Sequence, residues 1–396
     1  MANIQSSVGT EDNQSARVLI WSLRNVQNFV YNSCLFELED VIEDVDEANV
    51  LTPPQYNSTG TFIKRVIEYK TRRTGAFSLT KVNPYVGGIE LHYDYQIYFV
   101  VLDFPWYFTS VNLLKNWRRR CRFAVCYMIE LWSAEIPMMK NFMDFFNQFD
   151  LICTATYHIV DELQEISDVP CLFVPPGIDT LKFCPDFDGV NTEESRTIDV
   201  CSLGRGFPVT NEALLKKSQE DESFFYYHEL TNGSVLRVDD HRAHRTLVSN
   251  ILKRSRYFIT NYAKANLPEL IDGQHEIGYR FFEGAAAGNV LIGAPPLENL
   301  FGKSGLFFNW EDSIIPIELD EPNIIDIIAE LDAQPERVER IRRNNVANSL
   351  LQHDWVYRWE QILEKLELPI PQAVEDRKKL LKQKAEALLP AAAVAS

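Results

Sequence analysis

The chain has 396 residues, 46% of them hydrophobic, and its 56 acidic against 39 basic residues give a formal net charge of −17. A single hydrophobic core stops growing at about 250–300 residues, so this length predicts two domains. The acidic balance repels phosphates and therefore excludes nucleic acid as an expected partner. The richest apolar run, Ile97–Phe108, is interrupted by Asp103 and Pro105 and falls short of the ~20 residues of a membrane span.

The N-terminus and the cysteines indicate a cytoplasmic protein. The first sixteen residues are polar and lack the apolar segment of a secretory signal, so a disordered leader is expected there. Seven cysteines is an odd number, and no Cys-x-x-Cys pair occurs. This pattern predicts reduced, mostly buried thiols rather than a disulfide framework or a metal site.

Short β-branched and aromatic runs alternate with longer stretches of helical period, and the pattern restarts after the polar segment Asp186–Arg196. The predicted strands are Val18–Trp21, Ile97–Leu102, Phe123–Met128, Leu151–Thr154, Cys171–Val174, Ile198–Leu203, Arg256–Thr260 and Val290–Ile292. Helices are predicted at Ile324–Leu331, Glu336–Leu350 and Val356–Leu366. The fold class is therefore α/β, with two Rossmann-like, doubly wound parallel-sheet lobes whose strands point their carboxyl ends at a shared cleft.

The segment His275–Gly288 carries the densest chemical signal. Gly278 permits a close backbone approach where a helix begins, and such a helix N-terminus suits a diphosphate. Arg280 and Glu283 lie three residues apart on one helical face, so a guanidinium can meet phosphate oxygens while a carboxylate accepts from ribose hydroxyls. The alternative is an ordinary i,i+3 ion pair on a surface helix.

This segment resembles the retaining GT-B glycosyltransferases of the glycogen-synthase-like superfamily, the group 1 glycosyl transferases, and within them the bacterial CgeB-like branch. That superfamily has a Glu-x7-Glu element that closes on an Ala-x-Gly turn, and Glu283 with Ala286–Gly288 matches its second half. His275 stands where the first Glu is expected and Glu276 follows it, while Arg280 is similar to the Arg-x-x-Glu form of the CgeB-like branch. The resemblance implies a donor-binding set of Gly204, His275, Glu276, Gly278, Tyr279 and Glu283.

Two further elements resemble the same family. Pro176–Pro185 matches its Asn-Gly-Val-Asp-x-x-x-Phe-x-Pro hinge, in which Asp179 can cap the next turn and Phe183 can anchor the linker. Val200–Gly206 is similar to its Val-Gly-Arg turn, which implies that Arg205 binds the donor diphosphate. The companion Lys is absent, so Arg280 would serve as the second cation. The alternatives are an ordinary strand exit and an arginine that only stabilises a turn.

The acceptor side is predicted at Cys126–Trp132, because an aromatic ring beside a carboxylate suits a sugar. Glu130 and Trp132 are the candidates there. In the alternative, Trp132 belongs to the core and Glu130 caps a helix. Arg24 follows the first strand, where many relatives have glycines, and is assigned to acceptor binding as well.

Two other patterns have mainly structural interpretations. His241 and His244, beside two aspartates, could ligate a metal, but an exposed helix start is the commoner source of such a cluster, and no metal is expected. The stretch Lys64–Arg73 is basic in an acidic protein. It could receive an acidic acceptor or touch a membrane surface, and a solvated helix face is the plainer interpretation.

The resemblance implies five segments along the chain: a disordered leader (1–16), an acceptor lobe (17–190), a nucleotide-sugar donor lobe (191–350), a helix crossing back to the first lobe (351–372) and a charged helical tail (373–396). It implies a cytoplasmic glycosyltransferase of the hexosyltransferase type, with Arg205, Arg280 and Glu130 as catalytic residues. A sugar would pass from a nucleoside diphosphate, UDP favoured over GDP, to a hydroxyl of a glycan, a lipid-linked glycan or a small molecule.

Retention of configuration, with neither metal nor cofactor, is implied by the family. No membrane span is expected, peripheral contact with a membrane stays open, and so does the oligomeric state. Two alternatives remain. One is a sugar-nucleotide epimerase on the same fold, and the other is a GT-B binding protein without catalysis.

Overall fold

The computed structural model describes residues 16–55, 58–74, 82–85, 87–185, 195–230, 236–296 and 307–389. Apart from Ala16, the predicted leader lies outside these residues. So do most of the predicted boundary segment Asp186–Arg196 and the last seven residues of the predicted tail.

The described residues form two sheets, and every strand pairing in them is parallel. The first lobe has the strand order β2-β1-β3-β4-β5-β6, with the bounds β1 Val18–Trp21, β2 Ala48–Leu51, β3 Tyr95–Leu102, β4 Cys121–Met128, β5 Leu151–Thr154 and β6 Cys171–Phe173. The second lobe has the order β11-β10-β9-β7-β8, with the bounds β7 Ile198–Gly204, β8 Tyr226–Leu230, β9 Ser255–Ile259, β10 Val290–Gly293 and β11 Ile315–Pro316.

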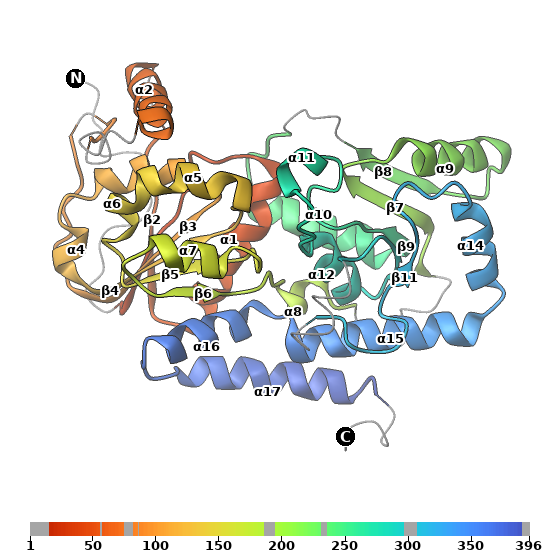
Figure 1. Ribbon diagram of the computed structural model, residues 1–396. Helices are drawn as coiled ribbons and strands as arrows, with labels where there is room; N and C mark the ends of the chain where they lie inside the picture. The colour runs from red at the N-terminus through yellow and green to blue at the C-terminus, as the bar shows by residue number, and fades with distance from the viewer. Residues whose placement is uncertain are drawn as a thin grey trace.

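Helices cover both faces of each sheet, as Figure 1 shows. Those of the first lobe are α1 Ser33–Val45, α2 Ser58–Thr74, α4 Trp117–Arg120, α5 Ile136–Met139, α6 Met143–Phe146 and α7 Val160–Ile166, with the 3-10 helices η2 Val30–Asn32, η3 Pro105–Leu113, η4 Ser133–Glu135 and η5 Lys140–Phe142. The linker holds α8 Thr180–Phe183. Those that follow are α9 Pro208–Glu220, α10 His241–Lys253, α11 Pro268–Ile271, α12 Tyr279–Ala286, α14 Ile324–Asp332, α15 Pro335–Gln352, α16 Trp355–Lys365 and α17 Gln372–Glu386.

Strand β3 shows why the first sheet is covered on both sides. Ile97, Phe99 and Val101 pack into a core with α1, α16 and α17, whereas the alternate residues Tyr98 and Val100 pack into a core with the short helices of the other face. Successive side chains of a strand point to opposite faces, so an unbroken apolar run is what a sheet buried on both faces requires. The predicted α/β fold class with two doubly wound lobes is therefore confirmed.

The C-terminal helices return to the first lobe, as predicted. Figure 1 shows α15 beneath the second lobe and α16 and α17 beneath the first. Trp359 of α16 is fully buried against Phe99, with 5.6 Å between ring centroids. The charged helix α17 packs against the first lobe. Val374 and Leu381 are buried in the same core, and Arg377 pairs with Asp179 of the linker at 2.7 Å.

The linker between the lobes has the predicted turn geometry. Asp179 accepts a hydrogen bond from the backbone N–H of Lys182 and so caps α8, and Phe183 is fully buried in the core of the second lobe. A side chain at Gly177 would collide with the ring of Trp355 at 2.6 Å, so only glycine fits beneath α16. The seven cysteines are all free, and six of them are buried, as predicted.

Candidate functional site

The strand order of the second lobe determines where a ligand can bind. After β7 the chain continues to β8 on one side of the sheet, and after β9 it continues to β10 on the other side, so the loops after β7 and β9 diverge. In open α/β sheets, ligands bind outside the carboxyl ends of the strands at such a switch point. Here β7 ends at Gly204 and its loop begins at Arg205, while the loop after β9 begins at Thr260.

Several of the predicted donor-side residues meet at this switch point. Gly204 has a φ of +91°, a conformation that suits glycine, and a side chain there would lie 3.8 Å from the guanidinium of Arg280. Gly278 is the N-cap of α12, and a side chain on it would lie 3.4 Å from the carbonyl oxygen of Asn261. Among the described residues no side-chain cap forms at this helix end, and although the N–H of Phe281 donates to the carbonyl of Gly278, the positive end of the helix dipole faces a potential anion.

The carboxylate of Glu283 is buried between two arginines. Its Oε2 accepts from Arg280 at 2.5 Å, and its Oε1 accepts from Nη1 of Arg245, a residue of α10. Arg245 in turn donates to Glu37 of α1, which belongs to the first lobe. The four side chains form a row of alternating charge from the first lobe to the switch point, and only Arg280, with 29% of its side chain exposed, reaches solvent.

The charges in this row stabilise one another. Burial acts to raise the pKa of Glu283, but Arg280 and Arg245 together hold that pKa below its ordinary value. Burial raises the pKa of Glu37, against the opposing effect of Arg245. The predicted Arg280–Glu283 contact is thus an i,i+3 ion pair, as in the structural alternative, but it lies on a buried helix rather than on a surface one.

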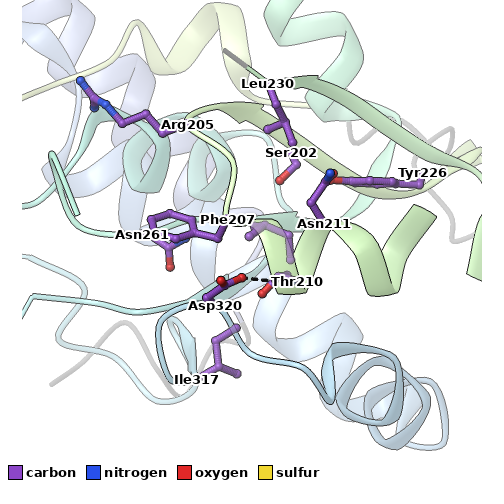
Figure 2. Close-up of a pocket in the computed structure, with 11 residues that line it drawn as sticks. Ser202, Arg205, Phe207, Thr210, Asn211, Tyr226, Leu230, Asn261, Ile317 and Asp320 are labelled. Atoms are coloured by element: carbon purple, nitrogen blue, oxygen red, sulfur yellow. Dashed lines mark hydrogen bonds between the residues drawn. The ribbon is translucent and has the colours of Figure 1, made fainter. Parts of the chain in front are cut away.

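A small hollow of about 10 Å³, partly open to solvent, lies beside the same loops (Figure 2). Its wall combines apolar side chains with polar ones: Ser202, Arg205, Phe207, Thr210, Asn211, Tyr226, Leu230, Ile259, Asn261, Ile317 and Asp320. Figure 2 shows Arg205 extending away from the other lining side chains, and the backbone N–H of Thr210 donating to Asp320 at 2.9 Å. Apolar contact beside hydrogen-bonding groups is the kind of lining that small-molecule sites have, but the enclosed space is that of roughly one water molecule.

Across the lobe boundary, Glu130 follows β4 of the first lobe. Its Oε1 accepts from the indole N–H of Trp132 at 3.0 Å and pairs with Lys264 of the second lobe at 2.7 Å. Partial desolvation lowers the pKa of Arg205, and nearby Glu130 opposes that shift while Arg280 adds to it. Arg205 therefore lies within electrostatic reach of the other two predicted catalytic residues, Arg280 and Glu130.

The residues predicted for the acceptor side differ in their burial and in their partners. Trp132 is only 1% exposed, so the alternative of a core tryptophan describes its packing. Glu130 does not cap a helix but binds Trp132 and Lys264. Arg24 pairs with Glu39 at 2.9 Å and with Asp40 of α1 at 3.1 Å, on the α1 side of the lobe boundary. Sugar binding by these residues stays a prediction.

His275 and Glu276 also lie at the lobe boundary. The ring of His275 stacks on Tyr262 with 4.0 Å between centroids, and Glu276 is buried and accepts from Nδ1 and the backbone N–H of His158, at 2.7 and 2.9 Å. Tyr279 packs against Trp355 of α16. Glu276 therefore joins the lobes, since His158 follows β5 of the first sheet.

The contact between His158 and Glu276 predicts a pH-dependent stability. The hydrogen bond to Glu276 raises the pKa of His158 above its ordinary value of 6.5, so the protonated ring stabilises the fold below about 6.5 and this contribution is lost as pH rises through the raised pKa. Urea midpoints of the protein and of His158→Gln should differ more near pH 6 than near pH 9. A difference that stayed constant, or grew with pH, would contradict this assignment.

Four residues at this boundary were not predicted from the sequence. Arg245 and Lys264 hold Glu283 and Glu130, and Asp320 lines the hollow. Asp103 follows β3, and burial, with a smaller contribution from Glu130, raises its pKa to about 7. The signal for Arg245 is present in the sequence, because this charged residue shares a helical face of α10 with the apolar residues Val248 and Leu252, and that face is buried.

His241 and His244 have other surroundings than a metal site. Nδ1 of His241 lies 2.8 Å from the hydroxyl of Ser33, and burial lowers the pKa of this histidine to about 4. Among the described residues, no group of three or more His, Cys, Asp or Glu side chains could hold a metal ion. Within the same residues, no helix combines the length and the apolar character that crossing a membrane requires.

The fold is similar to that of solved structures, and one region of the sequence matches a family model. The two lobes have the GT-B architecture of Anabaena Alr3699/HepE, whose structures with UDP and glucose and with UDP-glucose both match at a TM-score of 0.50 and 11% identity, covering 89% of this chain and 99% of that one. Trehalose-6-phosphate synthase OtsA matches at a TM-score of 0.52 and 10% identity, covering 90% and 100%.

Residues 227–364 match the family model described as glycosyl transferase-like. The matched region contains α12 with Arg280 and Glu283 and ends within α16. No curated protein matches the sequence. The chain thus carries a glycosyl transferase-like region on a GT-B fold.

Proposed function

We propose that the protein is a glycosyltransferase that moves a hexose from a nucleoside-diphosphate sugar to an acceptor hydroxyl, with retention of configuration and without a metal. The donor would bind the second lobe and the acceptor the first. The observation that carries the proposal is the meeting of Arg205, Arg280 and the uncapped N-terminus of α12 at the switch point of the second sheet.

The main barrier to sugar transfer is electrostatic. The bond between C1 of the sugar and the diphosphate oxygen breaks while the acceptor oxygen bonds to C1, and the acceptor proton leaves with the departing diphosphate. The sugar becomes cationic and the leaving group anionic. Arg205, Arg280 and the dipole of α12 would stabilise that anion, and fixed charges of this kind need no reorganisation during the reaction.

The buried row of charges gives Glu283 a specific part in this proposal. Both oxygens of Glu283 accept from arginines, so we propose that it positions Arg280 for the diphosphate. Contact between Glu283 and the ribose remains a prediction. His275, Glu276 and Tyr279 are proposed as further donor-side residues, and Glu130 with Trp132 as the acceptor side, where Lys264 holds the carboxylate of Glu130 in place.

UDP-glucose is the first donor to test. The hollow next to Arg205 offers polar groups for a nucleobase, and HepE, which shares the fold, has been solved with UDP-glucose. The uracil would bind at the mouth of the hollow while the diphosphate faces Arg205 and Arg280.

Product analysis tests the proposal and separates it from its alternatives. The protein is incubated with UDP- and GDP-sugars, with and without glycan, lipid-linked and small-molecule acceptors, and nucleotide release and sugar products are followed by NMR. A glycoside of unchanged anomeric configuration, formed equally with EDTA, is the expected result. An epimerised donor would support the epimerase, and a failure to bind any nucleotide in calorimetry would leave a binding protein of another kind.

A further inference from the structure

Helix α2 carries an exposed apolar stripe. Phe62 is 68% exposed, more than any other large hydrophobic side chain among the described residues, and Tyr69 and Val66 are 54% and 40% exposed. Their spacing of i, i+4 and i+7 puts all three on one face of the helix. The opposite face is buried, with Ile67 at 2% and Thr71 at 0%.

Basic side chains border this stripe. The helix contains Lys64, Arg65, Lys70, Arg72 and Arg73 against the single acid Glu68, which gives 5 − 1 = +4 in a chain whose net charge is −17. At 100° per residue, Arg65 and Arg72 fall on one side of the stripe and Lys70 on the other. The guanidinium of Arg73 lies over the ring of Tyr69, 4.7 Å from its centroid.

The helix is firmly attached to the first lobe through its inner side. Asn141 donates to the backbone carbonyl of Arg72 at 3.2 Å, and Nε of Arg72 lies 3.4 Å from the sulfur of Met138. The ammonium of Lys64 lies 4.8 Å from the ring centroid of Tyr107 in η3. Figure 1 shows α2 at the upper edge of the first lobe, well away from the second lobe. The outward stripe therefore belongs neither to the core nor to the lobe boundary.

We infer that the outer face of α2, formed by Phe62, Val66, Tyr69 and the bordering cations, docks on the surface of an anionic phospholipid bilayer. An apolar stripe flanked by cations is the pattern of helices that lie in the membrane interface, with the rings among the acyl chains and the cations at the phosphates. An acidic soluble ligand would engage the cations but would leave Phe62 in water. An anionic surface repels the net negative charge of the protein, so a basic face is needed for docking, and α2 provides one that also carries exposed aromatic side chains.

Vesicle sedimentation of the full chain tests the inference, with no dependence on catalysis. The expected result is binding to vesicles of equal parts phosphatidylcholine and phosphatidylglycerol at ~0.1 M salt, weak binding to pure phosphatidylcholine, and release at ~1 M salt, where charges are screened. Phe62→Ser with Tyr69→Ser should weaken the binding about tenfold or more, because two aromatic side chains no longer leave water. Arg65→Gln with Arg73→Gln should weaken it on anionic vesicles only.

Matched controls lie on the second lobe. Leu247→Ser removes a leucine of α10 that is 56% exposed, and Lys216→Gln with Lys217→Gln removes two charges from α9. Both should bind vesicles as the unaltered protein does. Equal binding to neutral vesicles, or an unchanged affinity in the Phe62→Ser single variant, would overturn the inference. So would tight binding of polyglutamate that the aromatic variants retain, which would assign the helix to an acidic soluble partner.

Discussion

Replacing Arg245 with methionine is expected to lower the free energy of unfolding by about 3–5 kcal/mol, because a buried ion pair that loses one partner leaves a buried charge uncompensated. Arg245 holds Glu37 of the first lobe and Glu283 of the second, and the three side chains are 0–4% exposed. Without the guanidinium, Glu37 keeps only the backbone N–H of Asp179 as a described donor. Urea unfolding followed by circular dichroism measures the loss.

The pH dependence of that loss identifies its cause. Burial already raises the pKa of Glu37 above its ordinary 4.5, and removal of Arg245 should raise it further. A carboxyl group whose folded pKa is raised destabilises the fold above that pKa, so the deficit of Arg245→Met should shrink as pH falls through the raised pKa toward 4.5. Adding Glu37→Gln should restore part of the stability.

Arg242 provides the control, since it lies three residues earlier in α10 and also crosses the lobe boundary. It pairs with Asp40 and Glu43 at 2.8 Å, but 57% of its side chain is exposed. Exposed pairs contribute about 0–1 kcal/mol, so Arg242→Met should cost far less. Equal losses in the two variants would show that burial of the charges is not what makes Arg245 important.

The sequence predicted the central strands of both sheets and missed strands at their edges. All eight predicted strands exist with bounds that differ by at most two residues, whereas β2, β8 and β11 were not predicted. These three are edge strands. An edge strand is covered less completely, and β8 is buried only at Tyr226, so it lacks the continuous apolar run that reveals a strand buried on both faces.

The donor side could be predicted because its residues follow strand ends or open a helix. Gly204, Gly278 and Arg280 stand at fixed offsets from strongly patterned elements. Their partners could not be found in this way. Lys264 and Arg245 belong to other α/β units of the fold. The order in which these units pack determines which side chains come into contact, and no local sequence pattern reveals that order. The burial of Trp132 could not be predicted for the same reason, because segments distant in the sequence form its surroundings.

Arg205→Gln is expected to lower kcat of sugar transfer by about 10²–10³-fold. This is the usual loss of rate when one fixed group that stabilises the negative charge of the transition state is removed. This prediction rests on the proposed function. Arg205 is exposed and lies near Glu130 and Arg280, so its removal should not disturb the core. Arg205→Lys should recover part of the rate, because a lysine retains the charge but not the planar fork of donors. Initial rates with saturating UDP-sugar, and melting curves of both variants, make the measurement.

Substitutions of Arg205 and Arg280 should differ in their effect on the stability of the fold. Arg280→Gln removes one of the two cations beside the buried carboxylate of Glu283 and should lower stability as well as kcat, whereas Arg205→Gln should lower kcat alone. Arg254 is the control, an exposed arginine that ends α10 just before β9 and binds its own helix, and Arg254→Gln should leave both quantities unchanged. Normal turnover in Arg205→Gln would place the leaving diphosphate elsewhere, because a cation next to the departing anion cannot be removed without slowing its departure.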